Sequence, residues 1–240
     1  MSCKIKIRKG SCFDLITITL TCFAFFIACP QSLAAEIKNS ASETTLLKSA
    51  LHDFDLKNYN EAFTLFKKAA PNDVSGTADS VIAIMSWERL IPHVHNVSNA
   101  KSTVFWGKKA LPKIRSNALR KYIITFMSDA YNDIGVAHAK QHNYVVAFQY
   151  YKKAAKMGCA DGQYNLGVLY AAGRGTIQDY KKAYAWISVG IAVGLNRKND
   201  AVATKIQSGI SQYLYAQGSL SKAKNLAKKY YKLYVPNVSP

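Results

Sequence analysis

Histidine pairs are the side chains of this sequence whose spacing comes closest to a reactive site. His93 and His95 follow Pro92, and an exposed pair of this kind could hold a metal ion weakly. His138 and His142 lie four residues apart, the spacing at which a helix places two zinc ligands on one face. Neither pair has a third ligand close in sequence or a following glutamate to act as a general base. We therefore expect solvated or packed histidines and no metal site.

A single cysteine and a glycine-rich turn are the other features that suggest chemistry. Gly158-Cys159-Ala160 is typical of a turn between helices, which favours a structural cysteine over a nucleophile. Gly173-Arg174-Gly175 lacks the Lys-Ser or Lys-Thr and the preceding strand of a phosphate-binding loop, and is better explained as a helix end with a turn. The Gly-x-Ser-x-Gly, His-Glu-x-x-His and dinucleotide-binding motifs do not occur. We therefore expect no catalytic residue, no cofactor and no enzyme.

The charge of the chain indicates what kind of partner it attracts. Its 240 residues carry 32 Lys and Arg against 14 Asp and Glu, a formal net charge of +18, while 49% of residues are apolar. Such a surface attracts anionic partners, for example acidic proteins, phosphate-bearing lipids or acidic polymers. The alternative is a solvated basic surface with no dedicated partner, and charge alone does not separate the two.

Residues 1–35 have the three-part pattern of a secretory signal peptide. A basic start is followed by an apolar stretch over 13–28 and by Ser32-Leu33-Ala34, which places small residues before a cleavage point. We expect an exported protein, periplasmic or secreted, with no transmembrane helix after cleavage. Two alternatives stay open. One is an uncleaved membrane anchor, and the other is a lipid anchor at Cys29, where Phe26-Ile27-Ala28-Cys29 faintly resembles a lipobox.

Residues 36–240 contain an internal repeat. Stretches that begin at Tyr59, Tyr144 and Tyr180 share an Ala three residues later, then a bulky residue four further on, then a small residue three beyond that. These positions fall on one helix face, where small residues let a neighbouring helix approach and the bulky residue fills the gap. Weaker copies lie near residues 103 and 223, which gives intervals of 41, 44, 36 and 40 residues.

Each copy follows another stretch with helical periodicity, so the repeat unit is a pair of helices. The first helices are expected at about 42–56, 77–91, 118–141, 160–172 and 200–217. One pair cannot bury its own apolar face, whereas stacked pairs can. We therefore predict an all-α fold, an α-solenoid of about five antiparallel helix pairs that curves around a concave groove.

Two neighbouring stretches resemble known helical repeats. Residues 128–161 resemble a tetratricopeptide repeat, with Tyr131, Ile134, Gly135, Ala147, Tyr151 and Ala154 at the motif positions and His138 replacing the usual aromatic residue. Residues 162–198 resemble the longer Sel-1-like repeat: 163–173 match its first helix, 174–180 its extended loop, and Lys182, Ala183 and Trp186 its second helix. Residues 200–234 are similar to a closing helix pair of bacterial members. The resemblance is weak over 42–115.

The resemblance implies an exported, non-catalytic adaptor that holds a protein or peptide in its groove, with roles in the cell envelope or in host interaction. First helices line the concave face in this architecture. The amides there would bond a bound backbone and the cations would meet carboxylates, so the ligand is expected to be acidic. The candidate partner-binding residues are Lys121, Tyr131, Asn132, Gln163, Tyr164, Asn165, Arg174 and Tyr213.

Lysine pairs give a second hypothesis. They recur at Lys67-Lys68, Lys108-Lys109, Lys152-Lys153, Lys181-Lys182 and Lys228-Lys229. All but the fourth pair sit late in second helices, where they complement the negative helix end by about 0.3–1 kcal/mol each. Together they would also form a basic ridge on the outer side that binds an anionic envelope polymer or lipid. Nucleic acid is not an expected partner, because an exported protein rarely meets it.

Overall fold

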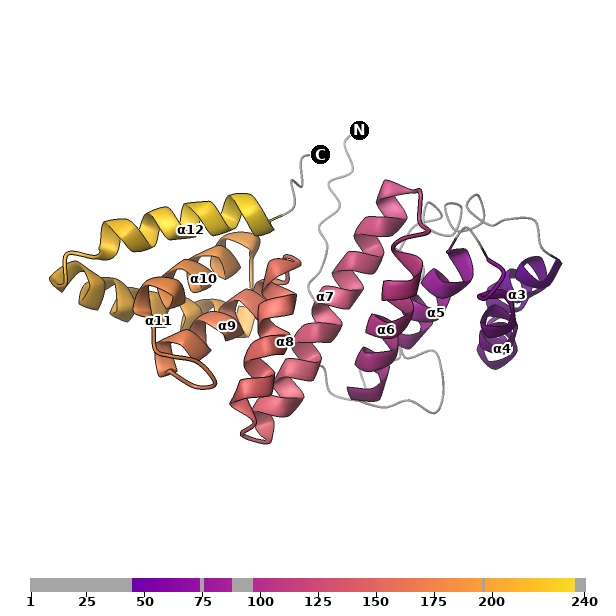
Figure 1. Cartoon of the computed structure of the whole chain (residues 1–240), viewed down its shortest axis with the longest axis horizontal. Coiled ribbons are helices and arrows are strands. Elements are labelled where there is room, and N and C mark those ends of the chain that lie inside the picture. The colour runs from indigo at the N-terminus through magenta and orange to yellow at the C-terminus, as the bar shows by residue number, and fades with distance from the viewer. Residues whose placement is uncertain (1–44, 74–75, 88–96, 196, 236–240) are drawn as a thin grey trace.

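The computed structural model describes residues 45–73, 76–87, 97–195 and 197–235, and every regular element within these ranges is an α-helix. The ten helices of these ranges follow one another up and down along an elongated array, with α7 and α8 near its middle (Figure 1). The predicted α-solenoid is therefore confirmed.

The predicted signal peptide, Cys29 and the pair His93 and His95 lie outside the described residues. The helices are α3 (Thr45–Asp55), α4 (Tyr59–Ala69), α5 (Thr77–Trp87), α6 (Val97–Ala110), α7 (Asn117–Lys140), α8 (Tyr144–Lys156), α9 (Ala160–Ala172), α10 (Tyr180–Val193), α11 (Arg197–Ala216) and α12 (Leu220–Tyr234).

Short polar or glycine-containing turns start and end the helices. Ser116 and Asn143 accept hydrogen bonds from backbone N–H groups in the first turns of α7 and α8, and so satisfy donors that have no partner inside the helix. Gly173 ends α9 with a φ of 66°, a left-handed conformation that only glycine adopts without strain. The interpretation of Gly173 as a helix end is thus confirmed.

The recurring small and bulky residues make the contact within each pair. A Cβ atom on Gly167 of α9 would lie 2.6 Å from Cγ1 of Ile187 and 3.0 Å from the carbonyl oxygen of Ala183, both on α10. A Cβ atom on Gly135 of α7 would likewise lie 2.6 Å from the ring of Tyr151 on α8. Gly135 and Gly167 are therefore each covered by the bulky residue of the second helix that follows.

The last pair is packed differently from the others. Helix α12 lies mainly against α10 and touches α11 little. Trp186 of α10 stacks on Tyr230 of α12 with ring centroids 4.4 Å apart, and its centroid lies 5.4 Å from that of Tyr234. On its other side α10 meets α11, where the amide of Gln207 donates to the hydroxyl of Ser188 at 2.7 Å. Helix α10 thus lies between α11 and α12.

No helix in the described part of the chain has the length and apolar character needed to cross a bilayer.

Replacing Gly167 with Ala should destabilise the fold, because the added methyl group would meet the backbone of α10, which cannot move aside easily. We expect the free energy of unfolding to fall by about 1–3 kcal/mol. The matched control is Gly209→Ala on α11, where a Cβ atom would meet nothing within 4 Å. That change should raise the free energy of unfolding by about 0.5–1 kcal/mol, because alanine favours the helix. Urea denaturation followed by far-ultraviolet circular dichroism measures both, and equal effects would contradict the packing argument.

Candidate partner-binding surfaces

Two of the predicted groove residues lie in direct contact. Nδ2 of Asn165 on α9 donates to Oδ1 of Asn132 on α7 over 2.9 Å. Asn132 is 9% exposed and Asn165 is half-buried. Each side-chain amide carries both donors and an acceptor, so this bond leaves further hydrogen-bonding capacity on both residues. The first helices of two successive pairs are therefore joined by a polar bridge that reaches the surface.

Tyr131 belongs to a packed cluster rather than to an open groove. Its side chain is 5% exposed, and its ring centroid lies 6.1 Å from that of Tyr150 on α8. The ammonium of Lys153 lies 5.6 Å from the Tyr131 ring and 5.2 Å from the Tyr150 ring, and His138 stacks on Tyr150. His142 instead lies in the turn after α7, with Nδ1 3.1 Å from the hydroxyl of Tyr144. The two histidines therefore have different neighbours.

Gln163 is fully buried. Its Nε2 donates to the carbonyl oxygen of Ala155 on α8 over 3.2 Å, as a polar group taken out of water requires. Gln163 therefore offers no surface to a partner in this conformation. Its neighbour Tyr164 is half-buried, and burial raises the pKa of its hydroxyl.

The other three candidates are exposed but lie apart along the array. Lys121 lies on α7, whereas Arg174 is in the loop that joins α9 to α10. The Arg174 guanidinium stands 5.0 Å from the ring centroid of Tyr144. Tyr213 on α11 is 49% exposed, and its ring lies 4.7 Å from that of Tyr180. Among the eight candidates, a hydrogen bond joins Asn132 to Asn165. Lys121, Arg174 and Tyr213 are exposed, and the latter two also lie beside aromatic rings.

Cys159 has a structural role in its turn. Its sulfur accepts the backbone N–H of Gly162 at 3.3 Å, and so caps α9. Burial, together with the negative charge of Asp129, raises the pKa of the thiol well above its usual value. A raised pKa keeps the thiol protonated and unreactive at neutral pH. Among the residues that the structure describes, no three or more His, Cys, Asp or Glu side chains gather as a metal site would require.

Lysines of the predicted ridge lie over aromatic rings one helical turn earlier. Lys67 stands 5.3 Å from the ring centroid of Phe63 on α4, and Lys109 stands 4.6 Å from that of Phe105 on α6. Lys152 repeats the arrangement on α8, 6.0 Å from Phe148. Cation–π contacts at exposed sites contribute about 0.5–1 kcal/mol each. These lysines therefore cover apolar rings, in addition to carrying charge at the surface.

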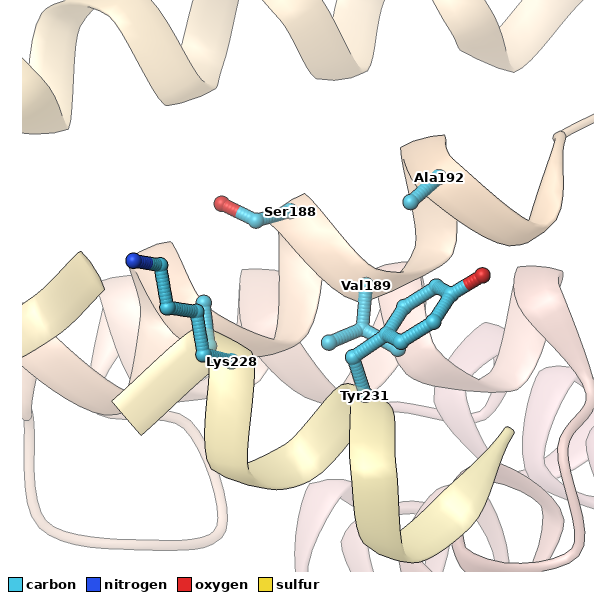
Figure 2. Close-up of a pocket in the computed structure, with 6 residues that line it drawn as sticks. Ser188, Val189, Ala192, Lys228 and Tyr231 are labelled. Carbon is cyan, nitrogen blue, oxygen red and sulfur yellow. The ribbon is translucent and has the colours of Figure 1, made fainter. Parts of the chain in front are cut away.

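A groove between α10 and α12 was not expected from the sequence. Its volume is about 420 Å³, and Figure 2 shows Tyr231 of α12 beside Val189 of α10. Comparison of equivalent repeat positions in the sequence could have indicated this groove. The α4 and α8 positions of Lys67-Lys68 and Lys152-Lys153 are occupied in α10 by Ser188 and Val189. The lining residues are Ser188, Val189, Ala192, Ala227, Lys228 and Tyr231.

Comparison with known protein families identifies the type of repeat. The model of the Sel1 repeat matches residues 54–71, 128–159, 160–188 and 207–233. The chain contains Sel1 repeats over these four stretches. Sel1 repeats generally serve as scaffolds for interaction between proteins, and the matches fall at both ends of the described array and in its middle.

Curated relatives and solved structures are similar over parts of their length. The chain is 36% identical over 76 residues to DAP3-binding cell death enhancer 1 of Rattus norvegicus and 34% identical to that of Mus musculus. These matches cover 31% of this chain and 15% of each relative. A protective antigen of uropathogenic Escherichia coli strains with an SLR fold has a TM-score of 0.42 at 18% identity, covering 73% of this chain and 42% of that one. A Sel1 repeat protein from Oxalobacter formigenes has a TM-score of 0.36 at 22% identity, with coverages of 75% and 64%.

Asp179 fixes the start of α10 and hence one wall of the groove. Its Oδ1 accepts the backbone N–H of Lys182 at 3.0 Å, and its Oδ2 lies 3.0 Å from the Lys182 ammonium. Burial acts to raise the pKa of Asp179, but the hydrogen bonds from Lys182 outweigh it, and the pKa is lowered. The carboxylate therefore stabilises the fold above its unfolded pKa of about 3.9 and loses this effect as the pH falls through the lower folded pKa.

Replacing Asp179 with Ala should lower the free energy of unfolding at pH 7 by about 1 kcal/mol, because the helix loses its N-cap. The Asp179→Asn variant keeps a capping oxygen and should lose less. Its deficit relative to wild type should shrink as the pH falls below about 4, where the wild-type carboxyl becomes protonated. Urea denaturation at pH 7 and at successively lower pH measures this difference, and a deficit that does not vary with pH would contradict the assigned role of the charge.

Proposed function

We propose that this protein is a non-enzymatic scaffold that binds an acidic segment of a partner protein along the first helices α7 and α9. The observation that carries the proposal is the hydrogen-bonded pair Asn132 and Asn165. It lies across two successive repeats and reaches the surface. A bound segment that crosses from one repeat to the next would pass over amide groups that can both donate to and accept from its backbone.

Lys121 supports an acidic partner from the same helix. It precedes Asn132 by 11 residues, close to three helical turns, so both residues lie on one side of α7. The rise over those residues is about 16 Å, which an extended segment of about five residues spans. A carboxylate at one end of such a segment would meet the exposed Lys121 ammonium while the other end contacts the amide pair.

The proposal includes export to the periplasm or beyond the cell, with a role in the envelope or in host interaction. Its support is the signal-peptide pattern of residues 1–35. A lipid anchor at Cys29 is the alternative form of the same proposal. Cleavage-site mapping of the mature N-terminus distinguishes them, because a lipid-anchored chain would begin at a modified Cys29.

The double change Asn132→Ala with Asn165→Ala should weaken partner binding about tenfold, because two hydrogen bonds to the ligand are lost. The partner is first captured from envelope and culture extract on protein lacking residues 1–35. The captured complex is washed at about 0.15 M and then about 0.5 M salt. We expect a discrete protein to remain after the second wash.

The control for this experiment is Asn117→Ala, which removes an exposed amide from the start of the same helix and should leave binding unchanged. Circular dichroism on each variant confirms that the helices persist. Unaltered affinity in the folded double variant would exclude the α7–α9 surface as the binding site.

The basic ridge is the second candidate function. It is favoured by one observation: the lysine pairs on the second helices α4, α6 and α12 are exposed and lie at equivalent positions of the repeat. A ridge of this kind would bind an anionic envelope polymer or lipid. In that case charge reversal at Lys108-Lys109 would abolish binding, about 0.5 M salt would release the ligand, and the asparagine variants would bind normally.

A further inference from the structure

The groove between α10 and α12 lies where the repeat changes its surface chemistry. After Tyr151, α8 carries three lysines that reach the surface: Lys152, Lys153 and Lys156. The equivalent positions of α10 hold Ser188, Val189 and Ala192, all of which line the groove. Helix α10 therefore lacks the long charged side chains that α8 carries at the equivalent positions. What remains is an uncharged surface of short side chains beside α12.

Fixed contacts keep the groove open and apolar. The stack of Trp186 on Tyr230 and Tyr234 anchors α12 on α10, and such ring pairs contribute about 0.5–1.5 kcal/mol each. The hydroxyl of Ser188 donates to the carbonyl oxygen of Tyr184 at 2.7 Å and accepts from Gln207. The polar atom of Ser188 is thus engaged within the protein. The groove offers an incoming group mainly the apolar atoms of its other lining residues.

The rim of the groove is strongly basic. From Tyr180 to Pro240 the sequence contains one acidic residue, Asp200, against ten basic ones. The nearest preceding acid, Asp179, is paired with Lys182. Lys228 lines the groove, and its side chain extends away from the floor in Figure 2. The other exposed lysines of α12 are Lys222, Lys224, Lys229 and Lys232.

We propose that the α10–α12 groove docks an acidic amphipathic helix of a partner protein. One or two apolar side chains of that helix sit on Ala192 against the ring of Tyr231, while its carboxylates meet Lys228 and the neighbouring lysines of α12. Laying the apolar face of a helix between two others is a recurrent mode of recognition. This surface is separate from the α7–α9 surface, and the inference stands without the function proposed above.

The shape and charge of the groove favour this occupant. Val189 is 1% exposed and therefore already covered within the protein, whereas Ala192 and Tyr231 are exposed, so the apolar contact surface consists of these two side chains. The groove, about 420 Å³ in volume, is open to solvent, so it can receive side chains that project from a partner resting on the surface. A second copy of this chain would bring the same excess of lysines to the contact, and like charges oppose that association. An acidic helix has both the complementary charge and the side chains that protrude.

The test uses the full chain and a set of fluorescein-labelled helical peptides with glutamates on one face and Leu or Phe at positions i, i+3, i+4 and i+7 on the other. Fluorescence anisotropy should detect binding with Kd values below about 100 µM. Replacing Leu and Phe by Ala in the peptide should weaken binding at least about tenfold, because the groove then stays empty. Replacing Glu by Gln should weaken it similarly, because the lysines then have no partner.

Variants of the protein locate the binding. Lys228→Glu and Ala192→Glu should each weaken binding at least about tenfold, because each brings a negative charge to the docked carboxylates. The controls carry the same charge changes away from the groove and its rim: Lys101→Glu on α6, and Ala216→Glu at the exposed end of α11. Both controls should bind within about twofold of wild type.

Four results would overturn the proposal. The first is that the wild-type chain binds no peptide, and the second is that the control variants lose as much affinity as the groove variants. The third is that replacing the apolar residues of the peptide by Ala leaves its affinity unchanged. The fourth is that Ala192→Glu still binds the peptide as wild type does. Binding of phosphatidylglycerol vesicles in place of peptides, with the same dependence on Lys228 and Ala192, would assign the groove to a lipid surface. A dimer in sedimentation that Ala192→Glu dissociates would assign it to a second copy.

Discussion

The close approach of each first helix to the second helix that follows it is the contact on which the array depends. Gly167 allows the backbone of α9 to meet α10, and Ile187 fills the space above it. Successive pairs meet in the same way, since a Cβ atom on Gly162 of α9 would lie 2.6 Å from the Cβ atom of Ala154 on α8. Packing this close leaves little freedom to slide. It therefore sets the register in which side chains of neighbouring first helices, such as Asn132 and Asn165, come together.

Residues that suggest chemistry in the sequence serve this packing in the structure. Cys159 caps a helix as a buried thiol, Gln163 bonds to the carbonyl of Ala155, and His138 stacks on Tyr150. The exposed polar groups include the lysines, which can take part in recognition of another molecule. The Sel1 repeats support a role as a scaffold for interaction between proteins, and the exposed side chains are where such an interaction would take place.

The two proposed surfaces arise from different physical causes. The α7–α9 surface depends on regular stacking, which repeats the orientation of first helices and aligns the asparagine pair with Lys121 on one side of the array. The α10–α12 groove depends on a local departure from that regularity. Helix α12 is held by Trp186 against α10 and touches α11 little. In the stretch of α10 that lacks lysines, Val189 is covered, while Ser188 is partly exposed and Ala192 is exposed.

Sequence alone determined the helical class, the first four helix pairs and the repeat register, because the spacing of Ala62, Phe66 and Ala69 and of their counterparts is a local property of one helix face. It also identified Gly173 as a helix end, since its conformation depends on its own backbone. It did not predict that α12 packs on α10 instead of α11. It did not distinguish accessible side chains from buried ones on the first helices: Gln163 and Asn165 are neighbours in the chain, yet one is enclosed by α8 and the other meets α7. The groove, too, was decided by tertiary structure. Its walls come from helices about 40 residues apart in the sequence, and only the stacking of Trp186 on α12 brings them together.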